Sequence, residues 1–223
     1  MKEVQSSYRI VDPVNNDAGI AMLRKIERMA RISHKSEEAQ APASWDRFIQ
    51  AVVMGHGDWS VVEHASATII FRVPRGVTHE LVRHRLFSYT QESTRFVNGR
   101  KSYPDGLEFI YPEEMKKLSA LCFDDWRKAM EMAEGHYLAM LDTGIRPQEA
   151  RSVLPNALAA TIAVTGNLRS WRHLFIMRTT KETHPDFRVV MIPLLGEMQA
   201  LIPLLFDDIK PGARQADNLR LPR

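Results

Sequence analysis

The sequence predicts a mixed α/β (α+β) fold in which a small sheet accompanies long helices. Segments whose apolar residues recur at helical spacing outnumber those with an alternating pattern. Only residues 65–73 and 159–165 are alternating and β-branched, as strands are. The chain has 223 residues, of which 44% are hydrophobic and 26% charged, a composition typical of a globular protein with a sizeable core.

The first part of the chain is expected to be helical. Residues 17–32 read as an amphipathic helix, whose apolar stripe is Ile20, Leu23, Ile26, Met29 and Ala30. The polar residues 35–42 are expected to form a mobile loop. Ser44 is then expected to cap a second helix that runs through Phe48, Val52 and Val53 and stops near Gly55.

The strand at 65–73 is expected to lead into a helix over residues 76–87. Val77, Leu81 and Val82 would then face inward, because they fall on one side of a helix of that phase. The arginine-rich segment that begins at Arg83 would lie at the end of this helix and in the loop after it.

The second half of the chain alternates long helices with turns. Residues 119–142 predict a long helix ending at Gly144, and Pro147 suits the first turn of a short helix holding Arg151. After the strand at 159–165, a capped turn over 167–170 should begin a helix that continues to Arg178. Pro185 is expected to open the final helix. We expect a single domain over residues 1–206 and a polar tail over 207–223 that frays.

Charge and cysteine content restrict the possible classes of protein. The net charge of +3 is too small to indicate nucleic-acid binding by itself. A single cysteine, Cys122, excludes an internal disulfide and a multi-cysteine metal site. The longest apolar stretch, 191–206, is too interrupted for a membrane span, and no leader pattern is seen. We therefore expect a cytoplasmic protein bound neither to nucleic acid nor to a membrane.

Three arginines in thirteen residues make the most informative feature. Arg83-His84-Arg85 is followed, after seven residues, by Ser93-Thr94-Arg95. Guanidinium groups stay charged and offer a planar set of donors that suits phosphate. Because the sequence has no dinucleotide fingerprint and no phosphate-binding loop with Gly-Lys-Ser, a phosphate would be held by side chains. A nucleotide fits this surface.

Two other features have a simpler interpretation. Cys122 is in helical step with Leu118, Trp126 and Met130, which favours a buried core thiol over a nucleophile. The tryptophans, Trp59 among them, favour packing. His56, Asp58, Glu63 and His64 are potential metal ligands, but the adjacent Glu63 and His64 would point apart on a strand. We expect no metal site.

The motif Arg83-His84-Arg85-x7-Ser93 resembles the one that defines flavin-dependent thymidylate synthases. Other segments resemble that family in the same order along the chain: residues 60–64 (Ser-Val-Val-Glu-His), 151–155 (Arg-Ser-Val-Leu-Pro), 167–170 (Asn-Leu-Arg-Ser), Arg178 and His184. The resemblance extends over roughly residues 45 to 190. It implies the fold of that family and a homotetramer with active sites shared between subunits.

The resemblance also implies a reaction. The family methylates dUMP to dTMP, using 5,10-methylenetetrahydrofolate as the one-carbon donor, NADPH as the reductant and bound FAD, without a covalent cysteine nucleophile. Two competing hypotheses remain at this stage. One is a metal-dependent nucleotide phosphohydrolase built on His56 to His64. The other is a non-catalytic basic module that binds RNA or DNA.

The resemblance assigns roles residue by residue. Flavin would contact Ser60, Arg83, His84, Arg85, Gln91, Asn167, Arg169 and His173. The nucleotide would contact Glu80, Arg83, Gln91, Glu92, Ser93, Thr94, Arg95, Arg151 and Arg178. Arg178 would be catalytic, because the family uses an arginine there to polarise the uracil ring.

The sequence departs from the family pattern at four places. Glu80 stands where the family often has Gln, and it has the spacing to pair with Arg83. Thr90 and Gln91 stand where Asn-Glu is common, with Glu92 shifted by one residue. Asp58 replaces a usual histidine, and His173 replaces a position that is often Asn.

Overall fold

The computed structural model describes residues 1–117 and 120–218. The chain divides into two compact units, each built from separated segments. Unit 1 comprises Met1–Ser7, Phe71–Arg83 and Tyr89–Ala163, and unit 2 comprises Tyr8–Ile70, His84–Ser88 and Val164–Arg223. The arginine-rich motif is therefore shared, since Arg83 belongs to unit 1 and the next two motif residues belong to unit 2. The single domain expected over residues 1–206 stays a prediction.

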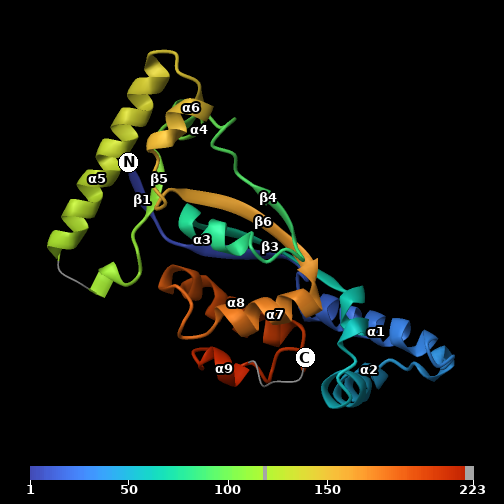
Figure 1. The fold of residues 1–223 in the computed structure, drawn as a ribbon. Helices are drawn as coiled ribbons and strands as arrows, with labels where there is room; N and C mark the ends of the chain where they lie inside the picture. The colour runs from blue at the N-terminus through green and yellow to red at the C-terminus, as the bar shows by residue number, and fades with distance from the viewer. Residues whose placement is uncertain (118–119, 219–223) are drawn as a thin grey trace. The chain divides into compact units, whose positions relative to one another are not determined.

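Unit 1 contains one long helix, α5, which lies along one side of the unit (Figure 1). The elements of this unit are β1 (Lys2–Val4), α3 (Arg75–Leu81), α4 (Gly99–Ser102), β5 (Glu108–Ile110), η4 (Met115–Lys117), α5 (Ala120–Asp142), α6 (Pro147–Ala150) and η5 (Arg151–Val153). β1 and β5 pair in parallel, with Val4 opposite Ile110. Their apolar face packs on α5, where the ring of Tyr111 meets that of Trp126 edge-on at 5.0 Å.

Unit 2 is mostly helical. Its elements are α1 (Asn16–Ile32), η1 (Glu37–Ala39), α2 (Ser44–Phe48), the π-helix η2 (Ile49–Gly55), η3 (Trp59–His64), α7 (Leu168–Arg178), α8 (Pro185–Leu201) and α9 (Gln215–Asn218). Its core contains Trp171, whose indole N–H donates to the carbonyl of Ala67 at 3.1 Å. Phe87 meets the ring of Trp171 edge-on at 5.0 Å.

A four-stranded sheet has the order β2-β3-β6-β4. Its strands are β2 (Ser7–Asp12), β3 (Ser66–Pro74), β4 (Ser88–Gln91) and β6 (Ala159–Asn167). The two central strands confirm those expected from the sequence. The model is a mixed α/β fold with a small sheet and long helices, as predicted. Among the described residues, no helix is both long enough and apolar enough to cross a membrane.

Several helix starts follow local rules. Asn15 caps α1, since its side chain accepts from the N–H of Ala18, and Asn167 caps α7 by accepting from Ser170. Pro147 and Pro185 occupy the first turns of α6 and α8, where their missing N–H costs nothing. The starts at Asn167, Pro147 and Pro185 confirm the predictions, whereas the cap of α1 at Asn15 was not predicted. α8 is not the last described helix, because α9 follows it. The expected start of the long helix at residue 119 lies outside the described residues.

The helix expected over 76–87 is shorter than predicted. α3 ends at Leu81, and the side chain of Val82, expected to face inward, is 38% exposed. The hydroxyl of Tyr89 donates to the carbonyl of Leu81 at 2.8 Å, which satisfies one of the terminal acceptors of the helix. Arg83 therefore lies beyond the helix.

Ser44 does not cap the second helix. Ala43 holds the cap position without a side-chain bond, and Ser44 is the first helical residue. Its hydroxyl instead donates to the buried carboxylate of Glu27 at 2.6 Å. A buried acceptor without donors would be costly, so this tertiary contact determines the role of the serine.

The described part of the polar tail packs on other residues of unit 2, to which it belongs. Asp208 accepts two bonds from Arg172, at 2.6 and 2.5 Å, and Ile209 is buried. Charge-assisted bidentate pairs are among the stronger polar contacts in proteins, and they order a segment that composition alone marked as frayed.

Gly19 permits the close approach of α1 to the end of α8. A Cβ at this position would lie 1.8 Å from the carbonyl oxygen of Leu201, which belongs to the backbone and cannot rotate away. We predict that Gly19→Ala lowers the free energy of unfolding by roughly 3 kcal/mol, near the upper end of the usual cost of overpacking. Chemical denaturation measures this.

Gly135→Ala is the matched control. Gly135 lies within α5, and a Cβ there would have no neighbour within 4 Å. Alanine should stabilise this helix by about 0.5–1 kcal/mol. Equal denaturation midpoints for the two variants would contradict the close packing of α1 and α8.

Candidate functional site

The two units carry separate parts of the candidate site. In unit 1, the segment 91–95 is anchored at several points. The amide of Gln91 donates to Thr78 Oγ at 3.0 Å, and the backbone N–H of Glu92 donates to the carbonyl of Thr161 at 2.8 Å. Ser93 Oγ accepts from the N–H of Arg95 at 3.2 Å. Because the family resemblance assigns all five residues to the nucleotide, we call residues 91–95 the substrate loop.

The short helical segment α6–η5 brings further polar groups to this loop, as the sequence predicted. Arg151 donates through Nη1 to Thr94 Oγ at 3.3 Å. Arg95 donates through Nε to Gln148 Oε1 at 3.3 Å, and its guanidinium lies over the ring of Phe96, 5.1 Å from its centre. The side chains of Arg95 and Arg151 are exposed, so both cations can reach an incoming anion.

Arg75 is a candidate that sequence reasoning missed. Its Nη1 is buried and has no hydrogen-bond partner within residues 1–117 and 120–218. Burial lowers its pKa, the positive charge of Arg151 lowers it further, and Glu92 opposes the shift. Arg75, Glu92 and Thr94 all line a cavity of about 20 Å³, roughly enough for one water molecule. A signal was present, because Arg75 precedes Arg83 by eight residues in the same chain segment.

In unit 2, α7 and η3 line an open pocket of about 510 Å³. Its walls are Trp59, Glu63, Leu86, Asn167, Arg169, Ser170, Arg172, His173 and Ile176. Arg169 Nη1 pairs with Glu63 Oε1 at 2.6 Å, and both side chains are about half exposed. Residues 59–64 form a 3₁₀ helix rather than the strand assumed earlier, and Ser60 is exposed on it.

The deeper wall of this pocket is fixed by Arg172. Its guanidinium lies 4.3 Å from the ring centre of Trp59 and pairs with Asp208. Trp59 is 2% exposed, and its indole N–H has no acceptor within the described part of the chain. The pocket therefore combines an apolar wall with an unused donor.

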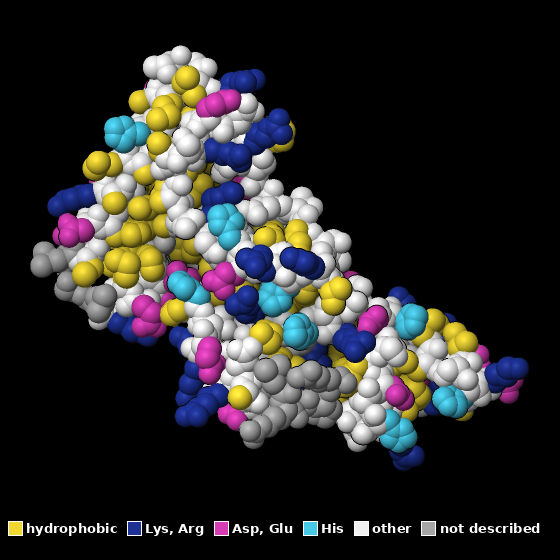
Figure 2. All heavy atoms as spheres, viewed as in Figure 1, with side chains coloured by type: hydrophobic (Ala, Val, Ile, Leu, Met, Phe, Trp, Pro, Cys, Tyr) yellow, Lys and Arg dark blue, Asp and Glu magenta, His cyan; other side chains and the backbone are white. Residues whose placement is uncertain are grey.

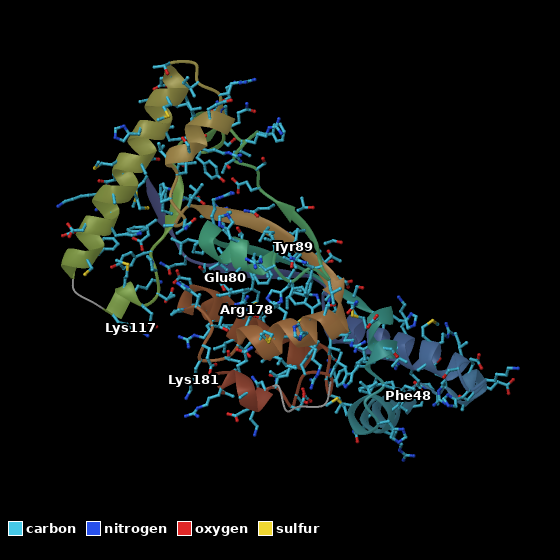
Figure 3. The ribbon with its side chains drawn as sticks, viewed as in Figure 1. Phe48, Glu80, Tyr89, Lys117, Arg178 and Lys181 are labelled. Carbon is cyan, nitrogen blue, oxygen red and sulfur yellow. The ribbon has the colours of Figure 1, made fainter. Side chains whose placement is uncertain are left out.

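The histidine of the arginine-rich motif contacts the end of α7. Arg178, labelled in Figure 3, donates through Nε to Nε2 of His84 at 2.9 Å. The rings of His84 and His173 face each other edge-on, with centres 6.4 Å apart. Burial, then the charges of Arg178 and His173, lower the pKa of His84 from 6.5 to about 4. A neutral ring is required here, because only then can Nε2 accept.

Two sequence-predicted cations, Arg83 and Arg85, are exposed. Gln91, Glu92, Ser93, Thr94, Arg95 and Arg151 come together in unit 1, and His84, Asn167, Arg169, His173 and Arg178 in unit 2, while the role of each stays a prediction. No group of three or more His, Cys, Asp or Glu residues that could hold a metal ion occurs within 1–117 and 120–218. Cys122, expected to be buried, is half-buried.

Comparison with known proteins identifies the family. Residues 20–204 match the model of the family described as thymidylate synthase complementing protein. The flavin-dependent thymidylate synthase of Corynebacterium efficiens is 37% identical over 71% of this chain and 67% of its own length. That of Mycobacteroides abscessus is 35% identical over 86% of this chain and 80% of its own length. The chain therefore belongs to the flavin-dependent thymidylate synthase family, whose members are methyltransferases.

Solved structures show the same fold. The UMP/dUMP methylase PolB from Streptomyces cacaoi, bound with 5-Br dUMP, superposes with a TM-score of 0.76. The match covers 93% of this chain and 96% of that one at 23% identity. The same methylase bound with 5-Br UMP gives a TM-score of 0.74 at 21% identity.

We predict that His84 stays neutral down to about pH 5, because its pKa is about 4. The unfolded chain binds this proton near pH 6.5, so the contribution of His84 to stability is complete above that pH and falls toward pH 4. Arg178→Met should raise the pKa of His84, because it removes a neighbouring positive charge. NMR titration of the histidine ring protons measures both effects.

Lys25→Met is the control, since it removes a cation from the exposed face of α1 in the same unit. It should leave the titration of His84 unchanged. An unaltered pKa of His84 in Arg178→Met would show that Arg178 does not control the protonation of this histidine.

Proposed function

We propose that this protein catalyses the FAD-dependent reductive methylation of dUMP to dTMP. In the proposal, 5,10-methylenetetrahydrofolate donates the carbon and NADPH is the reductant. Family membership and the same fold in a UMP/dUMP methylase bound with 5-Br dUMP support it. The observation that carries it is the contact between His84 and Arg178. Two motifs far apart in the sequence, each of which resembles the family, meet in one partly buried hydrogen bond.

The polar groups of unit 1 suit a nucleoside monophosphate. Arg75, Arg95 and Arg151 offer three guanidinium groups near one loop, and Ser93 and Thr94 add hydroxyl donors. The positive charge of Arg151 disfavours the charged form of Arg75, so the two guanidinium groups repel each other. A phosphate dianion would relieve that repulsion and accept charge-assisted hydrogen bonds. Glu80, Arg83, Gln91 and Arg178 complete the proposed nucleotide contacts.

The pocket of unit 2 fits a flavin. Its volume of about 510 Å³ is within the range of cofactor sites, which are mostly apolar with a few polar groups. Asn167, Arg169 and His173 supply those groups, and the unused indole N–H of Trp59 offers one more donor. Ser60, Arg83, His84, Arg85 and Gln91 are the remaining proposed contacts. When bound, the flavin would supply the reducing equivalents of the reaction.

Arg178 is proposed to act on the pyrimidine. Neutral His84 accepts from Nε, which holds the guanidinium in one orientation while its charge is retained. A fixed cation beside the uracil ring would stabilise the negative charge that develops as C5 becomes nucleophilic. No covalent cysteine is then required. The sole cysteine, Cys122, lies in α5, outside the substrate loop and the residues that line the two pockets.

The proposal extends to a cytoplasmic homotetramer with shared active sites. Arg83, Arg85 and Arg151 all present exposed guanidinium groups. Such groups suit a site that is completed by a neighbouring copy, because exposed cations gain little from pairing at the surface of their own chain. Figure 2 draws lysine and arginine side chains as dark blue spheres and histidine side chains as cyan spheres.

The absorption spectrum tests this function. The purified protein should carry flavin absorbance that bleaches with NADPH, and it should convert dUMP to dTMP when methylenetetrahydrofolate is added. dCMP is the control nucleotide and should not be methylated. Protein that binds no flavin, yet releases phosphate from nucleotides and stops in chelator, would replace the proposal with the phosphohydrolase hypothesis.

Arg75→Met tests the assignment of the phosphate site. Methionine keeps much of the side-chain length but removes the charge, so the Kd for dUMP should rise about 10- to 100-fold, as expected for a charge-assisted bond worth about 1.5–3 kcal/mol. Flavin content should not change. Isothermal titration measures the affinity.

Arg146→Met is the matched control, because Arg146 is exposed and pairs only weakly, at 3.5 Å, with Glu149. An unchanged Kd in Arg75→Met would remove Arg75 from the phosphate site.

A further inference from the structure

The carboxylate of Glu92 is surrounded by partners from its own chain. The hydroxyl of Tyr103 donates to one oxygen, and the backbone N–H of Thr161 approaches the other at 3.4 Å. Arg72 Nη1 lies 3.6 Å from that second oxygen. The side chains of Arg72 and Glu92 are 23% and 22% exposed, so these contacts are only partly screened by water.

The same residue anchors the backbone of the substrate loop. Its N–H donates to the carbonyl of Thr161 at 2.8 Å. Main chain and side chain of Glu92 are thus both fixed to β6, immediately before Ser93, Thr94 and Arg95. A shift at residue 92 would move Ser93, Thr94 and Arg95, which follow it. Such a shift matters because a misplacement of about 1 Å is enough to weaken the alignment of a bound ligand.

Glu92 also alters the charge balance around Arg75. Arg72 already pairs with Glu108, which leaves part of the charge of Glu92 available to other cations. Glu92 favours the charged form of Arg75, whereas burial and Arg151 disfavour it. The carboxylate therefore stabilises a buried guanidinium, but it also weakens the pull of that guanidinium on an incoming anion.

The bond from Tyr103 is itself half-buried. Burial, followed by the neighbouring Glu92, raises the pKa of Tyr103 to about 12. The phenol therefore keeps its proton at neutral pH and remains a donor to the carboxylate.

We propose that Glu92 is a positioning residue that anchors the substrate loop and offsets the charge of Arg75 without itself touching the phosphate. This inference rests on the proposed phosphate site and refines the contact that the family resemblance assigned to Glu92. Two opposite effects follow from it. Removing only the charge should strengthen anion binding, and removing the anchor should weaken it.

The test compares Glu92→Gln with Glu92→Ala in the purified flavin-containing protein. Titrations use two probes, dUMP and inorganic phosphate. Gln has a similar shape and keeps one accepting oxygen but removes the charge, so the Kd for both probes should fall about three- to tenfold, and the gain should shrink as salt is added. Ala should raise the Kd for dUMP at least tenfold. Tyr103→Phe should raise it by a smaller factor.

Glu131→Gln is the matched control, because Glu131 is exposed on α5, where it pairs with Arg127. It should leave both affinities unchanged. If Glu92→Ala does not fold, as melting curves would show, Glu92→Gln and Tyr103→Phe still give the opposite signs that the inference requires.

Three results would overturn the inference. The first is a loss of dUMP affinity in Glu92→Gln as large as in Glu92→Ala, which would indicate direct contact with the nucleotide. The second is unchanged affinity for both probes in Tyr103→Phe and Glu92→Ala. The third is a wild type that binds neither probe. If the wild type binds inorganic phosphate but not dUMP, only the proposed function is overturned. The Glu92 variants would then be compared by their Kd for inorganic phosphate.

Discussion

The hydrogen bond from Arg178 to His84 is the interaction on which the unit 2 site depends. It requires a neutral imidazole beside a permanent cation, and the surroundings supply that state. Burial, Arg178 and His173 all disfavour the imidazolium, so the acceptor is maintained at any physiological pH. The bond fixes the turn after α3 to the end of α7. It therefore joins two segments whose chemistry the sequence shows only separately.

In unit 1, burial and a neighbouring positive charge lower the pKa of Arg75, as they lower that of His84 in unit 2. Arg75 is partly buried next to Arg151, and part of its hydrogen-bonding capacity has no partner within the described residues. Glu92 compensates for some of this charge from the opposite side. Buried charge that is incompletely paired is costly, and it is retained in proteins mainly where a ligand completes the pairing. This charge arrangement is the basis of the proposed phosphate site.

Local rules predicted most element starts and failed at some ends. Asn167, Pro147 and Pro185 act within their own turns, so the sequence was sufficient there. The end of α3 was missed, because no glycine or proline marks it. Its last carbonyl is satisfied by Tyr89, which lies eight residues farther along the chain. Ser44 was assigned as a cap, but a buried carboxylate from α1 takes its hydroxyl.

The sequence by itself determined the mixed fold class, the two central strands and the family, because periodicity and ordered motifs are written along the chain. It also determined which residues could carry the chemistry. Only the tertiary structure decided that His84 meets Arg178, that Arg75 lines one cavity with Thr94 and that Glu92 faces its own protein. Those outcomes depend on burial and on distances between remote segments, and neither quantity is encoded by any local pattern of residues.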